Sequence, residues 1–168
     1  MDVALYQATT ADLPVVKNLA PYYIYDMSEH MGWPCTPDGR FGGCDVLESY
    51  WTAPGKHAFV LRAGEELAGF VLILADHDDP AIDFSVTDFF VLRKFRGRGA
   101  GERIALQLFD RFPGHWKIEQ FADNKPAVAF WHKVVDRYCN GKFEQRAGKS
   151  EWGMMNVLLF DNGGRAGK

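Results

Sequence analysis

Residues 83–110 pass from one kind of local structure to another within a single stretch. Residues 84–92 are rich in Phe and Val, which favour the half-buried positions of a β-strand, and apolar residues recur at roughly helical spacing over residues 104–109. The turn between them, residues 96–101, reads RGRGAG. Glycines let the backbone approach a ligand closely, and the first N–H groups of a helix point at negative oxygens. This stretch therefore predicts a site for a phosphate or pyrophosphate.

The turn does not fit the two commonest nucleotide motifs. A P-loop needs Gly-Lys followed by Ser or Thr, and this turn has no such pair. A dinucleotide fingerprint that starts at Gly97 would need a glycine where Glu102 stands. The pattern that does fit is R-x-x-G-x-G, formed by Arg96, Gly99 and Gly101. In this pattern the chain resembles the GNAT superfamily of acetyl-CoA-dependent N-acetyltransferases.

This resemblance implies acetyl-CoA as the cosubstrate. In that family the backbone amides of the motif hold the pyrophosphate of coenzyme A, and the preceding strand holds the pantetheine arm and the acetyl carbonyl. By position, Phe89, Phe90 and Val91 take the strand role. The loop role falls to a run of seven residues, namely Arg96, Gly97, Arg98, Gly99, Ala100, Gly101 and Glu102.

A second segment supports the resemblance. Asn124, Ala127 and Phe130 match three of the four named positions of the family's N-x-x-A-x-x-F-Y pattern, and Asn124 is also a good N-cap for a helix over residues 125–138. Trp131 stands where many members carry the tyrosine that protonates the leaving thiolate, and an indole N–H only donates. We expect Asn124 and Trp131 to line the cofactor site, with plain core packing as the alternative for Trp131.

The rest of the chain predicts strands and helices on either side of this centre. Helices are expected over residues 11–31, 45–51 and 125–138 and directly after residue 101, with an interruption near Pro21. Strands are expected at residues 3–8, 57–62, 67–75, 84–92, 116–122, 143–146 and 152–160. The resemblance implies the same order, β-α-α-β-β-β-α-β-α-β-β. The fold class is therefore α/β, an α+β mixed sheet with helices on both faces, in a GNAT-like acyl-CoA N-acyltransferase fold.

Length and composition fit one globular domain. The chain has 168 residues, 47% of them hydrophobic, and we expect residues 1–160 to form the domain and residues 161–168 a disordered tail. No apolar stretch approaches the ~20 residues of a membrane span and no signal peptide is apparent, so we predict a cytoplasmic protein. The three widely spaced cysteines indicate free thiols. Residues 157–160 are apolar and could supply the contact of a homodimer.

Transfer of an acetyl group to an amine needs a base, because an alkyl ammonium has a pKa near ~10.4 and is almost fully protonated at neutral pH. Alternation along residues 82–91 places Asp88 on the apolar face with Phe84, Val86 and Phe90. A carboxylate there is costly unless it is paired or re-aimed by a β-bulge, and burial would raise its pKa toward a useful range. Asp88 is our predicted base, with Asp83 or a water chain as alternatives.

The departing thiolate also needs a proton. Tyr138 is our predicted donor of this proton. Four further candidates are each more easily explained as structural, namely Tyr22, Tyr23, Tyr25 and His132.

The acceptor is predicted to be a small primary amine. Three acidic residues with neighbouring aromatic rings could attract its cation. They are Asp26, Glu29 and Asp38, with Tyr22, Tyr25 and Trp33. A solvated surface with core aromatics is the alternative for this group.

Other functions remain open from the sequence. A sensor that binds coenzyme A without turnover would account for the missing tyrosine. The basic residues among 93–103 could instead bind nucleic-acid phosphates, but the net charge of −3 argues against that function. His77, Asp78 and Asp79 are adjacent on one loop and no second cluster has ligand spacing, so we predict no metal site.

Overall fold

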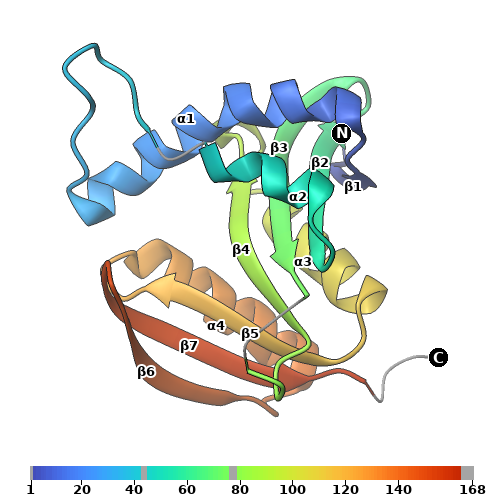
Figure 1. The fold of residues 1–168 in the computed structure, drawn as a ribbon. Coiled ribbons are helices and arrows are strands. Elements are labelled where there is room, and N and C mark those ends of the chain that lie inside the picture. Colours follow the sequence, from blue (N-terminus) through green and yellow to red (C-terminus); the bar gives the residue numbers. More distant parts are fainter. Residues whose placement is uncertain (1, 43–44, 76–78, 164–168) are drawn as a thin grey trace.

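The computed structural model describes residues 2–42, 45–75 and 79–163 and contains a sheet with the strand order β1-β2-β3-β4-β5-β7-β6 (Figure 1). All neighbouring strands are antiparallel except β4 and β5, which are parallel. The strands are β1 (Ala4–Gln7), β2 (Lys56–Ala63), β3 (Glu66–Leu74), β4 (Phe84–Val91), β5 (His115–Phe121), β6 (Glu144–Ser150) and β7 (Gly153–Asp161).

Helices cover both faces of this sheet, which confirms the predicted mixed architecture (Figure 1). Helices α1 (Leu13–Met31) and α2 (Ser49–Thr52) lie on one face, where they enclose a core with Phe70 and Phe90. Helices α3 (Ala100–Arg111) and α4 (Lys125–Cys139) lie on the other, over a larger core that includes Trp116 and Leu158. Short 3₁₀ helices occupy Thr10–Asp12, Asp45–Glu48 and Arg93–Phe95.

Helix α1 corrects one expectation, because it runs through Pro21 without the predicted interruption. A proline inside a helix removes one backbone hydrogen bond and crowds the preceding turn. Here side chains on both sides of Pro21 pack against the sheet, with Val16 and Ala20 buried before it and the Tyr23 ring packed against the same core after it. Tertiary packing therefore keeps the helix continuous where local chemistry alone would end it.

Strands β4 and β5 pair along only part of their length. Their register joins Phe84–Val86 to Trp116–Ile118 and goes no further. Beyond that point the two strands diverge, as Figure 1 shows. The facing backbone edges of residues 87–91 and 119–121 are therefore not bonded to each other, and a cleft can pass through the sheet between them.

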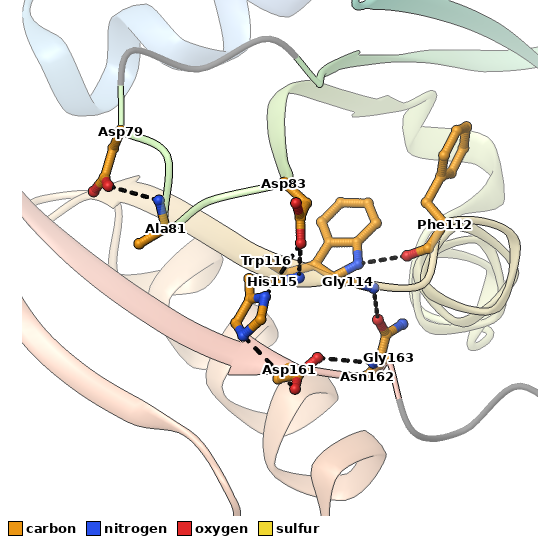
Figure 2. Close-up of polar contacts among 10 residues, drawn as sticks. All are labelled: Asp79, Ala81, Asp83, Phe112, Gly114, His115, Trp116, Asp161, Asn162 and Gly163. Atoms are coloured by element: carbon orange, nitrogen blue, oxygen red, sulfur yellow. Dashed lines mark hydrogen bonds and ion pairs between the residues drawn. The ribbon is translucent and has the colours of Figure 1, made fainter.

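Polar contacts hold β4 and β5 together at their paired ends, which form the closed end of the diverging strands (Figure 2). The Asp83 carboxylate accepts a hydrogen bond from the backbone N–H of His115 at 2.8 Å and lies 3.2 Å from its ring Nδ1. Gly114 donates its N–H to the side chain of Asn162 at 2.7 Å. The Trp116 indole N–H donates to the carbonyl of Phe112 at 2.9 Å. These contacts tie the starts of β4 and β5 to each other and to the end of β7.

A bulge in β4 corrects the predicted alternation of its side chains. Leu72 pairs with Asp88 whereas the next residue of β3, Ile73, pairs with Val86, so Thr87 is an extra residue on β4. The bulge reverses the faces beyond it. Val86 packs toward α3 and α4, whereas Phe90 packs toward α1. Asp88 does lie on the same face as Phe90, but that face carries α1 and not the core that holds Val86.

The end of the chain is more ordered than expected over its first residues. Asp161 closes β7, and Asn162 is buried with its amide bonded to the carbonyl of Phe109 at 2.5 Å. The remainder of the predicted tail, residues 164–168, lies outside the described residues, as do His77 and Asp78.

Candidate active site

Two adjoining cavities occupy the cleft between the diverging strands. The first has a volume of about 490 Å³ and lies over the glycine-rich turn and the start of α3. The second, of about 330 Å³, lies between β4 and the end of β5. Residues from α1, β4 and α4 line both, namely Tyr23, Met27, Phe89, Asn124, Ala127 and Trp131. Two ligands bound one in each cavity would therefore meet at these shared walls.

The first cavity presents backbone N–H groups to a ligand. Helix α3 begins directly after the turn, and its earliest helical hydrogen bond runs from the N–H of Arg103 to the carbonyl of Gly99. The N–H groups that precede Arg103 have no carbonyl in a preceding helical turn to bond to. Gly97 and Gly99 have φ values of 77° and 75°, a left-handed conformation that glycine adopts without strain. The turn thus aims several amides at the cavity, where the helix dipole also favours an anion.

Arg96 holds the turn against β4 and α1. Its Nε donates to the carbonyl of Val91 at 2.6 Å, and its terminal nitrogen pairs with Asp26 on α1. Arg93 pairs with the other oxygen of Asp26 at 2.8 Å. Partial burial alone would raise the pKa of Asp26, but the hydrogen bonds from Arg96 and Arg93 outweigh it and lower that pKa. Asp26 is therefore an ionised anchor for two arginines.

Two exposed cations near the turn have no such partner. Lys133 on α4 lines the first cavity, whereas the predicted residue Arg98 lies in the turn but is not among the walls of either cavity. Neither side chain lies within 4 Å of a carboxylate among the residues that the structure describes. Lys133 lines the first cavity together with Pro126 and Phe130, which precede it on the same face of α4. Lys133 belongs to no motif in the sequence, although the helical spacing of these three residues could have indicated it.

The start of α4 forms the wall shared by both cavities. Asn124 caps the helix by accepting the N–H of Ala127 at 3.1 Å, and its amide nitrogen lies 3.5 Å from the sulfur of Met27. Trp131 is buried, with its ring centroid 5.0 Å from that of Phe89 and in contact with both cavities. The structure thus brings Asn124 and Trp131 together with the glycine-rich turn.

Tyr23 and Asp88 form a hydrogen-bonded pair behind the junction of the cavities. The Tyr23 ring packs between Phe70 and Phe90, at centroid distances of 6.0 and 5.8 Å, and lines both cavities. Burial raises the pKa of the Asp88 carboxyl to about 6, although hydrogen bonds from Thr87 and Tyr23 act in the opposite direction. Burial, with the charge of Asp88 beside it, also raises the pKa of the Tyr23 hydroxyl. Asp88 itself lines neither cavity, so Tyr23 stands between it and a ligand.

The second cavity has largely apolar walls with a small polar group on β5. Tyr23, Met27, Phe121 and Met155 approach it from the α1 side of the sheet. Gln120 also lines it, and the side chain of this residue is only 4% exposed. Beyond Phe121, the ring of Trp33 contacts Phe121 at 6.1 Å and Trp152 at 6.3 Å between centroids. These rings extend the apolar wall toward the solvent.

Several predicted residues lie away from the cavities. Tyr138, near the end of α4, is buried in the larger core, where its hydroxyl donates to Asp110 at 2.9 Å and accepts from Asn162 at 3.2 Å. Asp83 lies at the closed end of the diverging strands (Figure 2). His132 stacks edge-on against Phe143 at 5.3 Å. The structure does not bring these side chains together with the cofactor loop.

The predicted acceptor-side acids are largely engaged elsewhere. Asp26 is paired with two arginines, and Asp38 is paired with Arg40 in the loop after α1. Tyr22 and Tyr25 are exposed, and the Tyr25 ring contacts Phe41 at 5.7 Å. The predicted cation-binding group is therefore dispersed.

The described ranges contain no helix long and apolar enough to cross a membrane. Within the same part of the chain, no three His, Cys, Asp or Glu side chains gather closely enough to hold a metal ion.

A strand that splays from its parallel neighbour, ends in a glycine-rich turn and leads into a helix start suited to an anion is the arrangement that the sequence resemblance implies for an acyl-CoA-dependent transferase. Comparison with protein families gives the same class, because residues 20–135 match the model described as "Acetyltransferase (GNAT) family". The chain belongs to this family and is an acetyltransferase. No curated protein matches the sequence.

Solved structures show the same fold at low sequence identity. An acetyltransferase from Thermus thermophilus is 18% identical with a TM-score of 0.68, covering 96% of this chain and 97% of its own. The spermidine N-acetyltransferase of Vibrio cholerae, solved with CoA and spermine, is 13% identical with a TM-score of 0.67 and covers 96% of each chain. The ribosomal-protein-S18-alanine N-acetyltransferase of Escherichia coli is 14% identical with a TM-score of 0.62, covering 95% and 94%.

Proposed function

We propose that this protein transfers the acetyl group of acetyl-CoA directly to the primary amine of a small molecule while both substrates are bound. The observation that carries the proposal is the pair of adjoining cavities with Tyr23 at their junction. One cavity offers amides for a pyrophosphate, and the other offers a separate space for an amine. Solved neighbours named for spermidine and for an alanine of a ribosomal protein support the use of this fold with different amine acceptors.

The residues of the first cavity suit the cofactor. The turn from Gly97 to Glu102 would hold the pyrophosphate through its amides, and Lys133, which lines this cavity, would pair with a phosphate. Arg98 stays a predicted phosphate partner from its place in the turn. Phe89, Phe90 and Val91 would border the pantetheine arm and the acetyl group. Backbone N–H groups along the open edge of β4 are suited to stabilise an oxyanion, because the bulge and the divergence leave that edge unpaired with β5.

The Tyr23–Asp88 pair offers a path for the proton. The ammonium first loses one proton to solvent, and its nitrogen then attacks the thioester carbonyl. The attacking nitrogen gives its second proton to the Tyr23 oxygen while the phenol proton moves to Asp88. When the C–S bond breaks, Tyr23 gives a proton to the sulfur and regains one from Asp88. The pair ends as it began, and it serves in place of the tyrosine that Trp131 replaces.

A sensor without turnover is the second candidate, because Trp131 removes the usual proton donor of the resemblance. Thiol release distinguishes the two. We expect acetyl-CoA and coenzyme A to raise the melting temperature, whereas NAD and ATP should not, and we expect amine-dependent release of free thiol. A melting shift without thiol release for any amine would favour the sensor. No shift with either acyl carrier would refute the cofactor site. The cytoplasmic location and the homodimer stay predictions.

A further inference from the structure

The second cavity contains a buried hydrogen-bond donor that nothing in the described fold uses. The side-chain nitrogen Nε2 of Gln120 is buried and has no hydrogen-bond partner among the described residues. A buried donor without an acceptor destabilises the folded protein relative to one that is satisfied. Such a group at a cavity wall is a feature that a ligand can complete.

In the structure, a neighbouring amide engages the oxygen of the Gln120 side chain and leaves its nitrogen without a partner among the described residues. Gln145 on β6 donates its Nε2 to the Asn156 oxygen at 2.6 Å, and Asn156 on β7 donates its Nδ2 to the Gln120 oxygen at 2.7 Å. Asn156 and Gln120 are direct cross-strand partners. Asn156 accepts from Gln145 and donates to Gln120, so the Nε2 of Gln120 remains for a partner other than these amides.

The charges around the cavity restrict that partner. Glu119 is the charged residue among the described walls of the second cavity, and its carboxylate is paired with Lys117 at 3.0 Å. A polycation would therefore meet one carboxylate that is already neutralised. A free carboxylate would meet no cation among those described walls. A neutral oxygen, such as an amide or ester carbonyl, satisfies Gln120 without placing a second charge in the cavity.

The remaining walls select the body of the acceptor. Met27, Phe89, Phe121 and Met155 give the cavity apolar and sulfur-containing surfaces, which suit an aliphatic or aromatic group. We propose that the acceptor is a primary amine that carries an apolar group and a neutral carbonyl, and that Gln120 donates a hydrogen bond to this carbonyl. Gln120 is thus a specificity-determining residue of the site. This inference rests on the proposed acetyl transfer.

The test compares phenylalaninamide with phenethylamine, which lacks the carbonyl, as acceptors for acetyl-CoA. The amine pKa differs between the two, so the informative quantity is how a substitution changes their ratio of kcat/KM. Gln120→Met keeps the size of the side chain and removes the donor. Gln120→Glu keeps the contact with Asn156 and replaces the donor by a carboxylate. A lost hydrogen bond to a buried donor corresponds to roughly a 5- to 150-fold effect. Both variants should therefore lower the kcat/KM for phenylalaninamide relative to that for phenethylamine by about that factor.

Three results would overturn the inference while leaving acetyl transfer intact. They are an unchanged ratio in both variants, a wild-type preference for spermidine, and a wild-type preference for free phenylalanine over its amide. Gln107→Met is the matched control, because this glutamine is exposed on α3 and lines neither cavity, and it should leave the ratio unchanged. Absence of thiol release with every amine, together with no melting shift by acetyl-CoA, would instead refute the proposed function. Melting curves of each variant without ligand report whether it has folded.

Discussion

The two cavities are built in different ways. In the first, the predicted anion-binding groups come from one continuous stretch, in which β4, the glycine-rich turn and the start of α3 follow each other in the chain, and side chains of α1 and α4 complete the walls. Its main ligand groups are backbone amides, whose positions follow from the local conformation. The second draws side chains from α1, β4, β5, α4 and β7, which only the folded sheet brings together. A cavity made from backbone can keep one ligand through many sequences, whereas one made from distant side chains can change its ligand by a few substitutions.

The largest expected effect tests the proton path at the junction of the cavities. Asp88→Asn removes the proton acceptor and keeps the shape of the side chain, and we expect kcat to fall by about 10²- to 10⁴-fold. Tyr23→Phe should give a similar loss, because it breaks the same path. In the wild-type protein the rate should rise with pH through about 6, where Asp88 ionises.

The control for this experiment is Tyr138→Phe, because Tyr138 lies away from both cavities. It should leave the pH profile unchanged even if it lowers stability through the lost bond to Asp110. Turnover of Asp88→Asn that equals wild type from pH 6 to 9 would exclude the path. The junction would then serve binding alone.

The next effect concerns the backbone-built cavity. A Cβ at Gly101 would lie 3.2 Å from two ring carbons of Phe130, closer than the ring accommodates without moving. Gly101→Val adds branches that push on this ring and fill the space beside the turn. We expect the Kd for acetyl-CoA to rise by about 10- to 100-fold, with a smaller rise for Gly101→Ala, because the helix start must shift by only a few tenths of an ångström.

Gly42→Ala is the matched control, because nothing lies within 4 Å of a Cβ at that position. Calorimetric titration with coenzyme A measures both effects. Equal affinity in Gly101→Val and wild type would mean that the ligand does not approach the start of α3. The contrast between a backbone-built and a side-chain-built cavity would then fail.

How far each cavity could be predicted follows from this contrast. The strand, turn and helix over residues 84–111 carry local signals, so the turn and its position relative to α3 could be identified from the sequence. Asp88 could be singled out as a carboxylate among apolar neighbours, but its pairing with Tyr23 could not. That pairing depends on the bulge at Thr87, and nothing in the spacing of β4 distinguishes a bulged strand from a regular one.

The same reasoning explains the other misses. Pro21 was expected to interrupt α1, because local chemistry does not register how much apolar surface a helix buries on each side. Gln120 gave no signal, since a glutamine in a strand is ordinary until the fold places Asn156 on its oxygen and leaves its nitrogen without a partner among the described residues. Tyr138 and Asp83 were plausible by residue type alone. Only the fold shows that they serve the core and the closed end of the sheet.

Stability gives a third and smaller test at the junction. Asp88 has an ordinary pKa of 3.8 when unfolded and about 6 when folded, so between these values the folded protein holds a proton that the unfolded chain has lost. Stability therefore falls as pH rises from about 4 to 6, and the loss persists above 6. Asp88→Asn stays neutral, so at pH 7 it should unfold with a free energy higher by about 1–3 kcal/mol. Urea unfolding of both proteins at pH 4 and pH 7 measures this free energy. If the variant and the wild type differ in free energy of unfolding by the same amount at both pH values, the carboxylate is not buried as described.

The smallest expected effect concerns the first cavity. It distinguishes the contribution of the backbone amides to coenzyme A affinity from that of a nearby cation. Lys133→Ala removes one exposed charge at the phosphate end, and we expect about a tenfold weaker affinity for coenzyme A, against no change for Lys142→Ala beyond the far end of α4. The loss should shrink as salt is raised, since ions screen an exposed charge but not a hydrogen bond from a backbone amide. If raising the salt weakens wild-type binding no more than that of Lys133→Ala, this lysine does not face a phosphate. The amides would then carry the recognition of the anion without help from α4.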